Sequence, residues 1–154
     1  MAHVRSQIRD AVATRLTGLV TTGSKVFRSQ NFPNQPGLIP SLIIYTRSDV
    51  ASYDDEAASM GPPTPARTID LRVKGYARGA ATTLDTPDDQ MDTIAAEVET
   101  AMFTDHTFGG LAIETQLGDT EITVDGEGDQ AHGVIDIGFN VTYRTVEGAP
   151  ETAV

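Results

Sequence analysis

Cysteine and tryptophan are absent from this 154-residue chain, and aromatic residues make up only 6% of it. Without cysteine the chain forms no disulfide, thiolate nucleophile, iron–sulfur cluster or Cys-ligated zinc site. A chain of this length buries roughly two thirds of the surface that its unfolded form exposes, so it can build a core without such crosslinks. We therefore expect a single domain over residues 1–146 and a flexible tail over residues 147–154.

Long apolar runs are also missing. The densest apolar stretch, Leu38–Tyr45, is eight residues long and is interrupted by Pro40 and Ser41. A helix that crosses a bilayer needs roughly 20 apolar residues, and the first residues of the chain lack the apolar core of a secretion signal. We therefore expect a soluble chain with no membrane partner.

Basic residues are scarce after position 47. Residues 1–47 hold six basic groups and one acid, whereas residues 48–154 hold five basic groups and 21 acids. An acidic surface repels nucleic-acid phosphates, which argues against specific DNA or RNA binding. A basic end on an acidic body is able to pair head to tail with another copy of the chain. The alternative is an ordinary scatter of solvated charge.

Apolar residues recur at helical spacing in two segments. The first predicted helix is His3–Leu19, and the second runs from Thr86 to about Thr104. Thr86 is placed to cap the second helix and Pro87 to occupy its first position, while acids in the first turn favour the helix dipole. Both helices have one apolar face, which predicts that they pack on a common core.

Five other segments have the composition of β-strands. They are Lys25–Arg28, Ser41–Arg47, Thr68–Arg78, Ala112–Val124 and Val134–Thr145. We expect the second and third to pair as a long-looped hairpin. The predicted inward side chains of the last two strands are Ile122, Val124, Ile135, Ile137, Phe139, Val141 and Tyr143. The element order α-β-β-β-α-β-β predicts an α+β fold, with a mainly antiparallel sheet of about five strands and two helices packed on one face.

Residues Ser48–Ala66 combine acids and prolines, which predicts a long exposed loop. Loops of this length inside a compact domain are usually functional or disordered. The residues that we expect to contact a partner there are Tyr53, Asp54, Asp55, Glu56 and Met60. The alternative is a tolerated surface insertion without a partner.

The residues that could act in catalysis or bind a metal do not form a known motif for either role. His3, His106 and His132 have no second ligand at a useful spacing. The acidic stretch 125–129 resembles the opening of a calcium loop but lacks its glycine and its final ligand, so a hairpin turn fits better. The strand Thr68–Arg78 places its basic residues and Tyr76 on one side, which we interpret as solvent-facing rather than as a nucleic-acid stripe. We therefore predict no catalytic residue, no metal and no cofactor, and not an enzyme. A small hydrolase with an unrecognised site is the remaining alternative.

Five segments, taken together, resemble the tail terminator, or tail-completion, proteins of tailed bacteriophages and gene transfer agents. These segments are IRDAVATRLTGL, VFRSQNFPNQPGLIPSLIIYTRSD, RTIDLRVKGYAR, LDTPDDQMDTIAAEVETAMF and TEITVDGEGDQAHGVIDIGFNVTYRT. The resemblance extends over residues 3 to about 146. It consists of an order of elements with local similarity and contains no invariant chemical motif.

The resemblance implies a structural subunit of a virion, assembled in the host cytoplasm. Such subunits form a hexameric ring at the head-proximal end of the tail tube, stop tube polymerisation and provide the surface for head joining. The expected partners are other copies of the chain, the tail tube protein and a head–tail connector or stopper protein, while genomic DNA passes through the lumen without specific binding. Arg5, Arg9 and Arg15 are the predicted ring-interface residues. Another connector or stopper of the neck is the alternative function.

Overall fold

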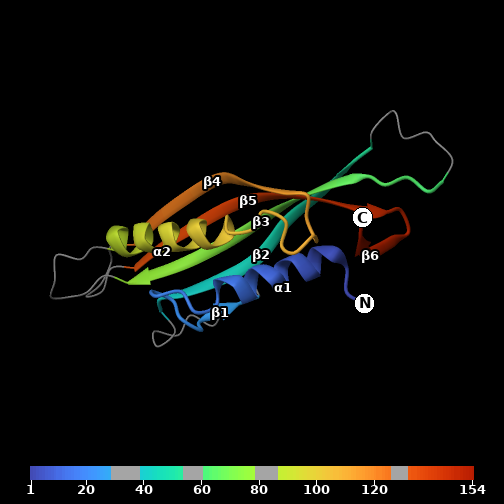
Figure 1. Cartoon of the computed structure of the whole chain (residues 1–154). Coiled ribbons are helices and arrows are strands. Elements are labelled where there is room, and N and C mark those ends of the chain that lie inside the picture. The colour runs from blue at the N-terminus through green and yellow to red at the C-terminus, as the bar shows by residue number, and fades with distance from the viewer. Residues whose placement is uncertain (29–38, 54–60, 79–86, 126–131) are drawn as a thin grey trace.

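The fold consists of two helices packed on one face of a sheet, as Figure 1 shows for the computed structural model. The structure describes residues 1–28, 39–53, 61–78, 87–125 and 132–154. Its elements are α1 (Val4–Leu16), β1 (Val26–Phe27), β2 (Ser41–Ser52), β3 (Ala66–Arg78), α2 (Pro87–Met102), β4 (Glu114–Asp125), β5 (His132–Val146) and β6 (Ala149–Ala153). The predicted α+β class is confirmed, although the described residues form six strands instead of about five.

The strands are ordered β1-β2-β3-β5-β4, and β6 pairs with the end of β5. Among the strand pairs of the described residues, β1 and β2 run parallel and the others are antiparallel. The predicted hairpin of the second and third strands is confirmed, with Ile43 opposite Lys74. Within the described part of the chain, β1 and β4 are therefore the two ends of this strand path.

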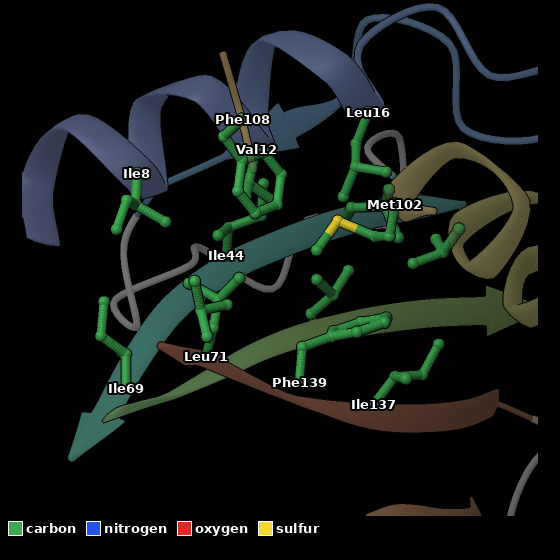
Figure 2. Close-up of a cluster of buried hydrophobic side chains, with 14 of the residues drawn as sticks. Ile8, Val12, Leu16, Ile44, Ile69, Leu71, Met102, Phe108, Ile137 and Phe139 are labelled. Carbon is green, nitrogen blue, oxygen red and sulfur yellow. The ribbon is translucent and has the colours of Figure 1, made fainter. Parts of the chain in front are cut away.

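Helix α1 contributes four fully buried side chains to the core, Val4, Ile8, Val12 and Leu16. Figure 2 shows three of them, Ile8, Val12 and Leu16, pointing from the helix toward the strands. The helix ends at Leu16 instead of the predicted Leu19, because Thr17 is extended and Gly18 has a φ of 96°. A left-handed backbone of this kind is a common helix terminator and favours glycine.

Helix α2 begins at Pro87, as predicted, and ends at Met102, two residues before the predicted end. The predicted cap, Thr86, lies outside the described residues. The helix packs closely on β3 at Gly75, where a Cβ atom would lie 3.0 Å from the side chains of Ile94 and Ile135. The glycine therefore allows α2 to approach the centre of the sheet.

The predicted loop Ser48–Ala66 is wrong at both ends. Residues 48–52 continue β2 and pair with residues 66–70 of β3, after a bulge between Thr46 and Ser48. The bulge changes the side-chain alternation, which is why the apolar pattern of Ser41–Arg47 does not reveal the continuation. Residues 54–60 lie outside the described residues, and 61–65 form no strand.

The end of the chain, where we expect a flexible tail, also contains a strand. Residues 149–153 form β6, which pairs with Thr145 and Val146 of β5. The Gln7 side chain on α1 donates a hydrogen bond of 2.8 Å to the backbone oxygen of Glu151. Backbone pairing and this bond hold the segment in place, and neither leaves a hydrophobic pattern in the sequence.

Candidate assembly surfaces

The histidines are not arranged as a metal site. Among the described residues, no group of three or more His, Asp or Glu side chains lies where it could hold a metal ion. His3 instead caps α1, because its Nδ1 accepts a 3.1 Å hydrogen bond from the backbone N–H of Arg5. Burial and the nearby charges of Arg5 and Arg67 lower the pKa of His3, which favours the neutral ring. A structural role therefore accounts for this histidine.

Neither helix offers a membrane span. They contain 13 and 16 residues, and the described residues include no helix with the length and apolar character that crossing a bilayer requires.

Two of the three predicted interface arginines already bind a carboxylate in their own chain. Arg5 lies 3.0 Å from Asp49, and Arg15 lies 3.5 Å from the carboxylate of Asp105. Arg15 also donates a 2.7 Å hydrogen bond to the Asp105 backbone oxygen and stacks over Phe108. Arg9 reaches only the Ser6 hydroxyl, at 3.4 Å, and its buried Nε has no hydrogen-bond partner among the described residues. Arg9 is thus the most available of the three.

Asp49 forms the most connected polar cluster in the described structure. Its carboxylate accepts hydrogen bonds from Arg5, from Arg67 at 2.9 Å and from the Tyr143 hydroxyl at 2.8 Å. Burial and the Asp49 carboxylate raise the pKa of Tyr143, so the hydroxyl stays protonated and donates. The cluster joins α1 to three strands. The sequence pattern does not predict this cluster, because Asp49 falls within the predicted loop.

Beyond Asp49, β2 and β3 form an arm that extends past the N-terminal end of α1 (Figure 1). Val50 and Tyr53 are exposed on it. The turn between β5 and β6 supports the arm, because the Glu147 backbone N–H donates a 2.9 Å hydrogen bond to the Pro63 oxygen and the Tyr53 hydroxyl lies 3.3 Å from the Glu147 carboxylate. The other predicted contact residues of the loop lie outside the described residues: Asp54, Asp55, Glu56 and Met60.

The sheet face opposite the helices carries charged and aromatic side chains. Arg72 is only 4% exposed, with a 2.8 Å hydrogen bond to Asp70 and one of 2.9 Å to Asp119. The expectation that Arg72 faces solvent is therefore wrong. The bulge in β4 after Leu117 provides the reason, because it places Asp119 against the guanidinium and covers it.

Strand β4 exposes three large apolar side chains on one face of the sheet. The β4 row, as we name it, consists of Leu117, Ile122 and Val124, which are 47%, 56% and 47% exposed. They lie opposite Phe139, Ile135 and Gly133 of β5, on the helix-bearing face. Ile122 and Val124 point to the helix-bearing face, as predicted, but they are exposed and not buried. Helix α2 packs on β3 and β5, so it stops short of the edge strand.

A second apolar surface lies between α1 and β1. The α1–β1 segment, residues 17–28, exposes 95% of Val20. Together with α2 it borders an open groove of about 440 Å³, lined by Gly18, Leu19, Val20, Ala96, Glu97, Thr100 and Ala101. Glu97 fixes the segment on α2 by accepting hydrogen bonds from the Thr21 backbone N–H and hydroxyl, at 3.3 and 3.1 Å. These hydrogen bonds therefore fix the segment that forms one wall of the groove.

No protein-family model matches the chain, and no curated protein matches it. Among solved structures, the chain is similar to one from a structure described as "Virion of native gene transfer agent (GTA) particle", with 15% sequence identity and a TM-score of 0.49. The similarity covers 93% of this chain and 92% of that chain. These values do not assign the chain to a family, so we infer its function from its sequence and its surfaces.

Proposed function

We propose that the chain is a structural virion protein of the tail terminator kind. Copies of the chain form a ring, hexameric as the sequence resemblance implies, at the head-proximal end of the tail tube. The ring stops tube polymerisation and provides the surface to which the head joins. The protein needs no catalytic residue, metal or cofactor for this role. It belongs to the virion and assembles in the host cytoplasm.

The β4 row is the observation that carries this proposal. A long apolar edge strand in solvent invites pairing with another chain, and natural proteins usually cover or interrupt such edges. Strand β4 has twelve residues and includes neither lysine nor proline, and the described residues leave its row uncovered on both sides of the bulge after Leu117. A subunit that is built to lie beside a neighbour has a reason to keep this edge open. The sequence resemblance over residues 3–146 selects the tail terminator among such assemblies.

The arm formed by β2 and β3 is the proposed contact with the tube or with the connector. It projects from the body, and the Asp49 cluster and the β5–β6 turn stiffen its base. Tyr53 stands at the end of the described arm, where it can contact a partner with its exposed ring. Asp54, Asp55, Glu56 and Met60 follow it in sequence and remain proposed contact residues.

The basic end of the chain is the proposed ring contact, as the uneven charge implies. Among the three arginines of α1 we assign this role first to Arg9, since Arg5 and Arg15 bind carboxylates in their own subunit. The many acidic residues after position 47 suit the lining of a lumen through which DNA passes, because acidic walls repel DNA phosphates.

Tube capping is the direct test of this function. Tail tube protein is polymerised with and without the purified chain, and tube lengths and ends are recorded by negative-stain microscopy. We expect shorter tubes with a ring at one end. A variant in which a short Gly/Ser linker replaces residues 52–63 should still form rings and fail to cap. Unchanged tube lengths with the intact chain would contradict the terminator role, and rings that bind heads instead of tubes would identify a connector.

A further inference from the structure

We propose that protonation of His3 loosens the first turn of α1 from β2 and β3, so that this end of the fold responds to mild acid. The response belongs to a single subunit and is independent of the proposed ring. Two features of the structure support it: the contacts of both ring nitrogens of His3, and the charges that surround the ring.

Both ring nitrogens of His3 face hydrogen-bond donors. Nδ1 accepts the 3.1 Å bond from the Arg5 backbone N–H that caps α1, and Nε2 lies 3.4 Å from a guanidinium nitrogen of Arg67 on β3. A guanidinium only donates, and a neutral imidazole has one nitrogen that accepts. The neutral ring therefore satisfies one of these two donors, whereas the protonated ring, with an N–H at each nitrogen, satisfies neither. Gaining a proton thus removes the side-chain cap of α1.

The charges around His3 oppose a further positive charge. Arg5 on α1 and Arg67 on β3 both bind one carboxylate, that of Asp49 on β2. The Asp49 side chain is only 5% exposed, and it also accepts the hydrogen bond of the Tyr143 hydroxyl from β5. A protonated His3 is a third cation beside this single anion. Repulsion from the two guanidinium groups therefore weakens the contacts that hold the start of α1 on the strands.

Strand β6 contributes one acid near the start of the chain, Glu151. Its carboxylate lies 3.7 Å from the Met1 ammonium, and its backbone oxygen accepts the Gln7 hydrogen bond. Glu151 therefore already has a cation as its partner. Among the described residues, the acid whose charge acts on the His3 ring is Asp49.

The direction of the pH response follows from these surroundings. Burial, Arg5 and Arg67 lower the pKa of His3 below its ordinary value of 6.5, and Asp49 offsets only part of this effect. Above pH 6.5 the ring is neutral whether the first turn is closed or open, and the cap is intact. As the pH falls below 6.5, the open form takes up the proton more readily, so the closed first turn loses stability.

Hydrogen exchange of the full chain, followed by NMR, tests the response at the capped amide itself. The protection factor of the Arg5 amide should fall about fivefold from about pH 7.5 to about pH 5, as expected for the loss of a typical helix cap. His3→Ala has no side-chain acceptor, so protection should be low at both pH values. His3→Asn keeps a capping oxygen that does not titrate, so protection should stay near the wild-type value of neutral pH throughout.

Two further variants make the test specific to the contacts of His3. Arg67→Gln removes the guanidinium that faces Nε2, and should raise the pKa of His3, measured from the ring proton resonances. The matched control is His132→Asn. His132 is the exposed first residue of β5, at the end of that strand away from Tyr143. This variant leaves the contacts of His3 intact, so the Arg5 amide should still lose protection in acid.

Two results would overturn the acid response of His3. The first is an Arg5 amide that keeps its full protection at pH 5 in the wild type. The second is an equal loss of protection in His3→Asn, because a group other than His3 would then be responsible. Neither result bears on tube capping, so the proposed function stands or falls by its own test.

Discussion

Ile122 on β4 and Ile135 on β5 are directly opposite each other on the same face of the sheet, yet their surroundings differ completely. Ile135 is 1% exposed beneath α2, and Ile122 is 56% exposed at the edge. Around this pair, both strands place an apolar residue on this face at every second position, Ile122 and Val124 on β4 and Ile135 and Ile137 on β5. Alternation therefore determines which way a side chain points, while the position of the helices determines whether it is covered.

The difference follows from where the helices lie across the sheet. Helix α2 packs on β3 and β5, and α1 lies nearer to β2. These two helices cover the central strands and leave β4 beyond their reach. An apolar row at an uncovered edge is costly in a lone subunit and useful in an assembly. We infer that β4 keeps its apolar side chains for contact between subunits and not for the core.

Matched isoleucine truncations should show the largest contrast. Ile135→Ala removes buried methyl and methylene groups, and should lower the free energy of unfolding by about 2–5 kcal/mol. Ile122→Ala, the same substitution across the strand pair, should cost at most about 1 kcal/mol in the isolated subunit. Urea unfolding at concentrations where both variants are monomeric measures the two values. Equal losses would mean that the edge is covered as well as the centre.

A smaller effect is expected from overpacking under α2. Gly75→Ala places a Cβ atom 3.0 Å from the methyl groups of Ile94 and Ile135. The helix or the strand must shift, so we expect a loss of about 1–3 kcal/mol. The control, Thr120→Ala on β4, changes an exposed position and should alter stability by less than about 0.5 kcal/mol. Thermal unfolding followed by circular dichroism compares them, and a neutral Gly75→Ala would show that α2 is not closely packed there.

The smallest expected effect concerns the loop that leads from α2 to the edge strand. Hydrogen bonds from the Thr107 hydroxyl and backbone N–H, and from the Gly109 N–H, lower the pKa of Asp105 from 3.8 to about 2. A lowered carboxyl pKa adds stability above the unfolded value, and this stability is lost as the pH falls from about 4 toward 2. Asp105→Asn should flatten the dependence of stability on pH within that window.

Urea midpoints measured at intervals between pH 5 and pH 2 report this dependence. The matched control, Asp88→Asn, alters a carboxyl in the first turn of α2, far along the chain from the loop. An Asp105→Asn profile that parallels the wild type would contradict the role of these hydrogen bonds.

Much of the fold could be predicted because its core follows regular patterns. The buried face of α1 and the inward residues of β5, from Ile135 to Tyr143, were identified from spacing alone and are confirmed. The extension of β2 could not be predicted, since a bulge interrupts its alternation and a buried carboxylate, Asp49, replaces apolar packing. β6 has no side-chain pattern because backbone hydrogen bonds hold it.

The candidate surfaces were less predictable for a related reason. Exposure of Ile122 and Val124 depends on how far α2 reaches across the sheet, which no local pattern encodes. The partners of Arg5 and Arg15 are Asp49 and Asp105, both distant in sequence. Charge counting identifies the basic end of the chain, but only the structure shows which of its cations already have partners.

The mass of the chain in solution tests the central claim, that the uncovered row of β4 is a contact between subunits. Light scattering at low salt should give the wild type a mass several times the 16.4 kDa of one chain. A variant with both Ile122→Ser and Val124→Ser should remain folded by circular dichroism and give the monomer mass. Wild type and variant with the same oligomeric mass, or a wild type that stays monomeric at every concentration, would contradict the claim.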